Sequence, residues 1–233
     1  MALPRETPAR RQRHGAAPAD STRPRPERLP PHRTPPSALP RPPPQHPEAS
    51  HRLLGALAEA LADLLVGEWR AGASALQVFE SSAGELSPAD WREYSLPYLR
   101  RIAELVRARV PSVADGGPPL VVFARCAHHA FEALSETFDV VGVDWAVEPA
   151  EAVARVGDKC LALQGNLDPG RLYGDDDSIR AATRAMLEGF GDKPLIANLG
   201  WGMHPTHEPR ALKAYFTAVH EESAALRAAK ESV

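Results

Sequence analysis

Cysteine is scarce in this chain, and long apolar runs are absent from it. The 233 residues contain two cysteines, Cys126 and Cys160, which is too few for a disulfide framework and is compatible with a reducing compartment. No apolar stretch approaches the roughly 18 residues that a membrane-spanning helix needs. These shortages exclude a disulfide-stapled secreted domain and a protein that spans a membrane, so we expect no membrane partner.

Lysine is missing from the first 50 residues, which instead contain nine arginines and more than half of the 24 prolines. Such a segment cannot bury enough apolar surface to offset the entropy of ordering it. We therefore expect residues 1–50 to be a disordered Pro/Arg-rich arm and residues 51–233 to be the folded part. Because the arm is basic and the whole chain carries a net charge of −3, the folded part is acidic, which argues against a nucleic-acid partner.

Three interpretations of the arm remain open. It is Arg-rich and poor in acidic residues, as organelle transit peptides are, although its prolines oppose an amphipathic helix. The stretch Leu39–Pro44 is typical of a Pro-rich ligand for an aromatic groove. The third interpretation is a tail without function. We expect a cytoplasmic protein, or a plastid protein if the arm is a transit peptide.

Apolar strand patterns alternate with helical patterns in the folded part. The helical patterns cover residues 51–71, 88–109 with a break near Pro97, 128–136, 149 onward, 178–190 and 209–230. The strand patterns are Ala73–Ser81, Leu120–Arg125, Val140–Trp145, Cys160–Asn166 and Leu195–Gly202. The strands are apolar along their length, as in a parallel sheet. The sequence predicts an α/β fold with five parallel strands, too few to close an eight-stranded barrel.

Polar residues gather at the carboxyl end of each predicted strand. They are Glu80, Ser81, Arg125, Cys126, Asp144, Asn166, Asp168 and Asn198. Because parallel strands end at the same rim, this pattern predicts a site there. The stretch Leu161–Pro169 shows it best. Gly165 permits a close backbone approach, an extended chain would direct Asn166 and Asp168 to the same side, and Asx side chains typically shape loops by bonding their own backbone.

Five motifs together resemble the uroporphyrinogen decarboxylase family, in its order and at its spacing. They are Ala75–Ser81, Leu96–Tyr98, Val140–Trp145, Leu163–Pro169 and Ala197–Gly200. The resemblance runs from about residue 52 to 227 and covers the last five strands of that family's (β/α)8 barrel. It implies a partial (β/α)8 barrel for residues 51–233.

The resemblance implies a reaction. The family decarboxylates the four acetate arms of uroporphyrinogen III, which gives coproporphyrinogen III in haem and chlorophyll biosynthesis. It uses no cofactor, because the pyrrole itself accepts the proton and the electrons, and it generally works as a homodimer. The protein therefore has to position the substrate and stabilise charge.

The resemblance also implies substrate-binding residues. Ser81 matches the family's substrate-contacting serine, and Phe79 lies at the matching place on the same strand. Arg125 stands where many members have lysine or arginine, Asp144 belongs to a matching motif, and Trp201 replaces the family's histidine. The family's arginine segment and central aspartate have no match in residues 1–50, so no residue is assigned to catalysis.

Each assignment has a structural alternative. Ser81 can cap a loop, Asp144 can accept hydrogen bonds from loop N–H groups, and Arg125 can be a solvated rim charge. Trp201 can be a packing replacement, with the nearby His204 as a substitute imidazole.

The run Cys126-Ala127-His128-His129 has residue types that bind zinc, and the same superfamily contains zinc-dependent methyltransferases. Those need a further thiolate near the last strand. Cys160 lies at the start of its strand, at the opposite end of the barrel, so we expect no metal site.

Two hypotheses of function follow. The first is a uroporphyrinogen decarboxylase that is inactive alone and needs a homodimer or a complementing N-terminal half, because a five-stranded arc leaves two parallel edges exposed. The second is a non-catalytic fragment or pseudoenzyme that acts as a binding partner.

Overall fold

The computed structural model describes residues 46–232, which all fall within one compact unit. The predicted arm lies almost entirely outside the described residues, as do its three interpretations. The first described helix begins at Pro47, four residues before the sequence pattern predicts. No helix in the described part of the chain is long and apolar enough to cross a membrane.

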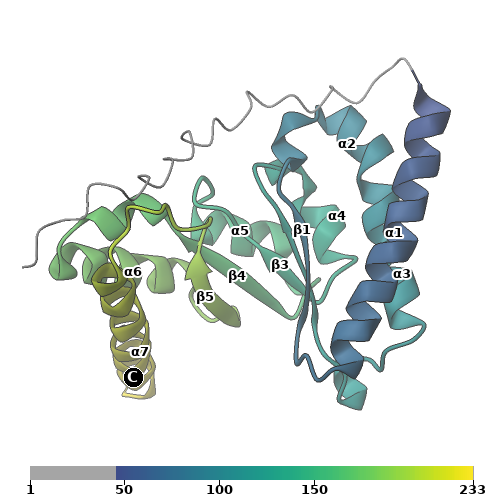
Figure 1. The fold of residues 1–233 in the computed structure, drawn as a ribbon. Coiled ribbons are helices and arrows are strands. Elements are labelled where there is room, and N and C mark those ends of the chain that lie inside the picture. Colours follow the sequence, from purple (N-terminus) through teal and green to yellow (C-terminus); the bar gives the residue numbers. More distant parts are fainter. Residues whose placement is uncertain (1–45, 233) are drawn as a thin grey trace, which may run out of the picture. The chain divides into compact units, whose positions relative to one another are not determined.

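Five strands alternate with helices along the described chain (Figure 1). The strands are β1 Leu76–Glu80, β2 Leu120–Ala124, β3 Val140–Gly142, β4 Ala162–Leu167 and β5 Leu195–Leu199. The α-helices are α1 Pro47–Arg70, α2 Pro88–Tyr94, α3 Leu96–Arg107, α4 Phe131–Ser135, α5 Pro149–Val156, α6 Asp176–Phe190 and α7 Pro209–Glu231. Short 3-10 helices cover Ala83–Glu85, Val113–Asp115, His128–Ala130 and Pro169–Tyr173.

The strands form one parallel sheet in the order β1-β2-β3-β4-β5. The predicted α/β fold, an arc of a (β/α)8 barrel with five parallel strands, is therefore confirmed. Among the described strands, β1 and β5 each have one neighbour, so the sheet is open at both edges.

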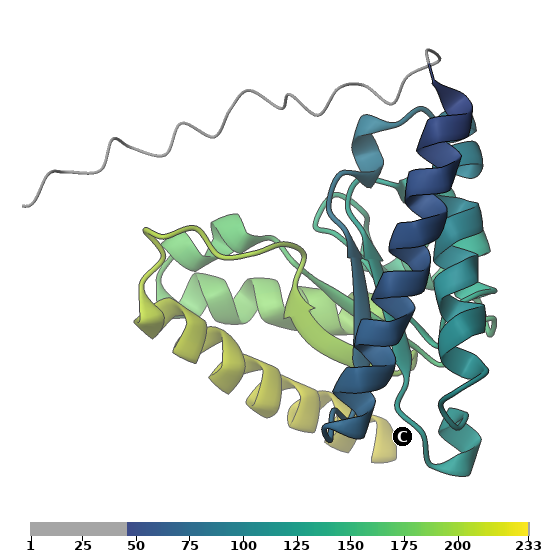
Figure 2. The same cartoon turned by 45° about the vertical axis from the view of Figure 1, so that its right-hand side comes forward.

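The two faces of the sheet have different environments. One face packs against the helices and supplies the core residues Leu76, Val78, Val122, Val141 and Leu163. Figure 2 shows α1 and α3 side by side next to β1. The other face, called the inner face below, carries Gln77, Phe79, Phe123, Gln164 and Asn198. The sequence patterns predicted strands buried on both faces, whereas the side chain of Phe79 is 66% exposed.

Local chemistry explains where the helices near the rim begin. Ser87 caps α2 by accepting a hydrogen bond from the N–H of Asp90, and Pro88 occupies the first helical position. The break between α2 and α3 falls at Ser95, with Pro97 in the first turn of α3. Asp175 caps α6 in the same way, through the N–H of Ser178.

Candidate functional site

An arginine lies among aromatic rings at the carboxyl ends of the strands. Arg125 follows β2, and its Nε donates a hydrogen bond to the backbone carbonyl of Ser81 at 2.8 Å. Its guanidinium carbon lies 4.7 Å from the ring centroid of Trp201, in the cation–π range. Loops that follow β1, β2 and β5 thus hold one cation in place.

The outer nitrogens of Arg125 are the chemically available part of this arrangement. Neither Nη1 nor Nη2 is bonded to any group in the described part of the chain, and Arg125 belongs to none of its ion pairs. Two parallel N–H groups in a fixed plane match the geometry of a carboxylate. The arrangement can therefore hold a carboxylate at the rim.

A row of aromatic rings lies beside this arginine. Phe79 contacts Phe123 edge to face, with centroids 6.3 Å apart, and Phe123 stacks on Trp201 at 5.8 Å and an interplanar angle of 26°. Phe79 and Phe123 are partners in the register of β1 and β2. Phe123 was missed from the sequence, although its pairing with Phe79 on adjacent parallel strands could have indicated it.

These rings border a hollow of about 340 Å³ on the inner face, called the inner hollow below. Its lining residues are Gln77, Phe79, Phe123, Val143, Gln164, Asn198, Leu199, Trp201, Gly202, Met203, Leu212, Tyr215 and Phe216. Tyr215 is buried, and burial raises the pKa of its phenol. Within this described lining, Tyr215 is the only side chain that can titrate.

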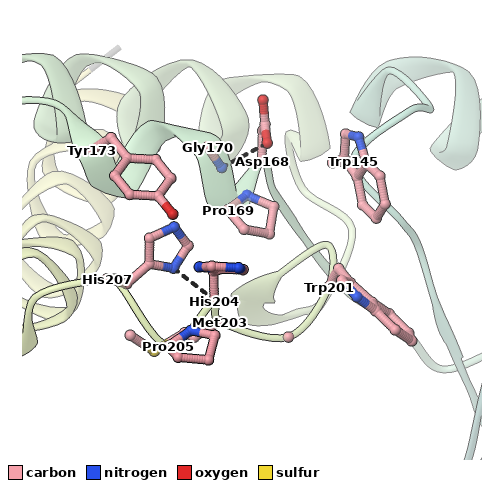
Figure 3. A pocket seen from close by; sticks show the side chains of 11 residues that line it. Trp145, Asp168, Pro169, Gly170, Tyr173, Trp201, Met203, His204, Pro205 and His207 are labelled. Carbon is pink, nitrogen blue, oxygen red and sulfur yellow. Dashed lines mark hydrogen bonds between the residues drawn. The ribbon is translucent and has the colours of Figure 1, made fainter. Parts of the chain in front are cut away.

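A second hollow of about 420 Å³, called the outer hollow below, adjoins the first (Figure 3). Its lining residues are Trp145, Asp168, Pro169, Gly170, Tyr173, Trp201, Gly202, Met203, His204, Pro205 and His207. The loops that follow β3 and β5 approach closely here because Gly200 has no side chain. A Cβ atom at that position would lie 2.3 Å from the backbone nitrogen of Trp145.

Asp144 differs from the other predicted substrate-binding residues because its side chain is buried and bonded to loops of the protein. Its side chain is 1% exposed, and its carboxylate accepts hydrogen bonds from the N–H groups of Cys126 and Ala146 and from the ring of His128. In this structure the carboxylate joins the loop after β2 to the loop after β3. The geometry matches the structural alternative for Asp144 and not its assignment to substrate binding.

Asn166 and Asp168 have different environments. Asn166 is buried, whereas Asp168 is exposed. The amide of Asn166 donates to the carbonyls of Asp144 and Val147, so it joins β4 to the loop that follows β3 and does not bond its own backbone. Asp168 accepts from the N–H of Gly170, as an Asx side chain that shapes its own loop does.

One glycine, Gly165, and one glutamate, Glu80, help to position the strands that carry the site. A Cβ atom on Gly165 would lie 2.5 Å from the carbonyl oxygen of Val143, which explains the close approach expected at this glycine. Glu80 accepts hydrogen bonds from Trp91 Nε1 and Ser95 Oγ. Burial raises the pKa of the Glu80 carboxyl group, and these two bonds oppose that rise. Glu80 therefore joins the end of β1 to α2 and α3.

Of the sequence-predicted residues, Phe79, Ser81, Arg125 and Trp201 come together. Ser81 takes part through its backbone carbonyl oxygen, which accepts from Arg125, and the predicted contact of Ser81 with a substrate stays a prediction. His204 lines the outer hollow with Trp201. Cys126 is exposed and Cys160 is buried. Within residues 46–232 no three His, Cys, Asp or Glu side chains are grouped so that they could hold a metal ion.

Fold and site together define a class of protein: an α/β chain that forms part of a (β/α)8 barrel, with an arginine among aromatic rings at the strand carboxyl ends. A family model described as uroporphyrinogen decarboxylase (URO-D) matches residues 44–222. The chain belongs to the uroporphyrinogen decarboxylase family.

Curated relatives agree with this membership. The chain is 47% identical over 180 residues to uroporphyrinogen decarboxylase of Danio rerio, which covers 77% of this chain and 48% of the relative. It is 44% identical over 184 residues to that of Homo sapiens, with 78% and 50% covered, and 43% identical over 184 residues to that of Salinibacter ruber, with the same coverage. The chain spans about half the length of these relatives.

A solved structure shows the same fold. A methyltransferase from Methanosarcina mazei superposes with a TM-score of 0.61 at 20% identity, over 76% of this chain and 51% of the methyltransferase. At this level of identity the similarity concerns the fold alone.

Proposed function

We propose that this chain binds a porphyrinogen at the inner hollow and contributes to uroporphyrinogen decarboxylation. The observation that carries the proposal is the guanidinium of Arg125, which Trp201 and the carbonyl of Ser81 hold with its outer nitrogens unbonded. A porphyrinogen combines pyrrole rings with carboxylate arms. The row of Phe79, Phe123 and Trp201 suits the rings, and Arg125 suits a carboxylate.

Decarboxylation of an acetate arm replaces a carboxylate by hydrogen. The pyrrole ring takes up a proton, and the bond to the carboxylate carbon then breaks, which releases carbon dioxide and sends the electron pair into the ring. The exocyclic methylene that remains accepts a proton and becomes the methyl group, while the ring loses the proton that it had taken up. Arg125 would orient an arm of the substrate, and the aromatic rings would exclude water. No carboxyl group or imidazole lines the described inner hollow, so we propose that the acid comes from elsewhere.

The proposed partner is a complementing N-terminal half that supplies the remaining βα units. The support is the sheet itself, because β1 and β5 each have one described neighbour and parallel strands are rarely left uncovered. Apolar side chains are also exposed at these edges, with Phe79 on β1 66% exposed and Ile196 on β5 44% exposed. A homodimer, which is common in the family, is the second arrangement.

The test is anaerobic incubation with uroporphyrinogen III, followed by chromatography of the oxidised porphyrins. We expect the purified chain to return only uroporphyrin when alone, although circular dichroism shows it to be folded. Mixed with a chain that carries the first three βα units of a family member, it should give coproporphyrin. Coproporphyrin, or partly decarboxylated porphyrins, from the chain alone would contradict the need for a partner.

The lack of an acid in the described inner hollow also favours a second function, that of a non-catalytic porphyrin-binding protein. This alternative predicts porphyrin binding that Arg125 supports, together with no turnover even when the complementing half is present. Turnover in the mixture would exclude it.

A further inference from the structure

The outer hollow contains a buried hydrogen-bond donor that has no partner. In the described part of the chain, the buried side-chain polar atoms without a partner are His129 Nε2, His207 Nε2 and Tyr215 Oη. His207 lines the outer hollow and its side chain is only 9% exposed. A buried polar group is costly to leave unpaired, so this nitrogen indicates a ligand atom.

The hydrogen bonds of the loop fix which proton His207 carries. The backbone N–H of His204 donates to His207 Nδ1 at 3.1 Å, so Nδ1 uses its lone pair and the hydrogen of the neutral ring is on Nε2. His204 Nδ1 lies 2.8 Å from Thr206 Oγ1 and 3.4 Å from the N–H of Thr206, so this second imidazole is bonded within its own loop. Nε2–H of His207 therefore calls for an oxygen acceptor.

Aromatic rings and one carboxylate complete the site. In Figure 3 the side chains of His207 and Tyr173 lie on one side of the outer hollow, and Trp145 and Trp201 lie on the opposite side. Asp168 also lines the hollow, and its Oδ1 accepts from the N–H of Gly170. Its Oδ2 has no hydrogen bond to any described residue and can accept one from a ligand.

Tyr173 packs against the ring of His207. Its ring contacts His207 edge to face, with centroids 4.3 Å apart. The tyrosine is 62% exposed, and the one side-chain hydrogen bond found for it in the described structure joins its hydroxyl to Thr206 Oγ1 at 2.7 Å. Tyr173 is thus an exposed side chain next to His207 that a ligand can displace.

We propose that the outer hollow binds an aromatic N–H ring that carries a carboxylate arm. Nε2–H of His207 donates to the carboxylate, Asp168 accepts from the ring N–H, and the ring lies between Trp145 and Trp201. The volume of about 420 Å³ is that of a small-molecule site. The proposal does not rest on decarboxylation. The ring can belong to a separate small molecule or to one pyrrole of a macrocycle held in the inner hollow.

The experiment follows the histidine ring nitrogens by NMR while indole-3-acetate is added as the probe. In the free protein, we expect His207 to be protonated at Nε2 and unprotonated at Nδ1. The probe should shift the ring signals of His207 and the indole N–H signals of Trp145 and Trp201, with a dissociation constant on the order of 1 mM. Indole-3-ethanol, which lacks the carboxylate, should bind at least tenfold more weakly.

Two substitutions distinguish the roles of the two ring nitrogens of His207 in binding. In His207→Gln the amide nitrogen reaches the place of Nε2, so binding should stay within about threefold of the wild type. In His207→Asn the shorter amide replaces Nδ1 only, so binding should fall at least tenfold. His220→Asn, an exposed change on α7 away from the hollow, is the matched control, and circular dichroism checks the fold of each variant.

Equal binding by the glutamine and asparagine variants would overturn the proposal, as would an absence of shifts in the wild type. Competition then identifies the source of the ring. If coproporphyrin III displaces the probe, the hollow holds one pyrrole of the macrocycle. If both bind together, the ligand is a separate small molecule. Failure of porphyrin to bind at all, with the probe still bound, would reject the proposed function and leave this site standing.

Discussion

Replacing Arg125 by glutamine removes the charge of the rim while it keeps a side chain of similar length. Hydrogen bonds to charged groups contribute about 1.5–3 kcal/mol each in proteins. Arg125 is partly exposed, and we therefore expect a loss of about 2 kcal/mol in porphyrin binding free energy, which is roughly 30-fold in affinity. Protein stability should change little, because no described carboxylate pairs with this arginine.

Trp201 should act on binding through Arg125. Trp201→Leu removes the ring 4.7 Å from the guanidinium carbon, and an exposed cation–π contact is worth about 0.5–1 kcal/mol, or roughly threefold in affinity. If the Trp201 ring only positions Arg125, the double variant with both Trp201→Leu and Arg125→Gln should bind porphyrin about as weakly as Arg125→Gln alone. Trp201→Phe should recover part of the loss.

The assay is a titration with coproporphyrin III, followed by porphyrin fluorescence at neutral pH and at two salt concentrations. The salt dependence of binding should be weaker in Arg125→Gln than in the wild type. Arg100→Gln, an exposed change on α3, serves as the control for an unspecific effect of charge. An affinity for Arg125→Gln within twofold of the wild type would refute the carboxylate role of this arginine.

Three further predictions concern stability and the open sheet. Asp144→Ala should lower the free energy of unfolding by about 3 kcal/mol, since it leaves three donors unpaired; a stable variant that fails to bind porphyrin would instead make Asp144 a ligand contact. Because burial raises the pKa of Glu80 in the folded state, its contribution to stability is present at low pH and is lost as the pH rises through that raised pKa. Glu80→Gln should flatten this part of the urea-unfolding profile between pH 4 and 7, and an unchanged profile would contradict the buried placement. Phe79→Ser should change stability by less than about 0.5 kcal/mol, because its ring is largely exposed, yet it should reduce porphyrin affinity and assembly with a complementing half, as measured by titration and sedimentation.

The parallel strands and the rim could be predicted because both follow from the alternation of strand and helix patterns, whereas the barrel arrangement came from the family resemblance. Parallel strands that alternate with helices bring their carboxyl ends together, whatever the side chains do afterwards. The grouping of Ser81, Arg125 and Trp201 on that rim followed from their places at strand ends. Their mutual contacts did not, since a backbone carbonyl and a ring face carry no sequence signal.

The directions in which side chains point could not be predicted from the sequence. Asp144 ends a strand as Arg125 does, but its carboxylate turns back to loop N–H groups, a choice that depends on three-dimensional packing. The role of His207 was also missed. No spacing rule distinguishes an imidazole with a free buried nitrogen from one that is fully bonded. A loop sequence with two histidines three residues apart, His204 and His207, was the only hint.

Trp201, Gly202 and Met203 line both hollows, so ligands bound in the two hollows would contact the same side chains. A ligand that turned the Trp201 ring toward one hollow would enlarge the other and release the guanidinium that rests on the ring. By linkage, whatever factor an outer ligand imposes on porphyrin affinity, porphyrin must impose on the outer ligand. Binding of a ligand in the outer hollow would then change the affinity for porphyrin in the inner hollow through the side chain of Trp201.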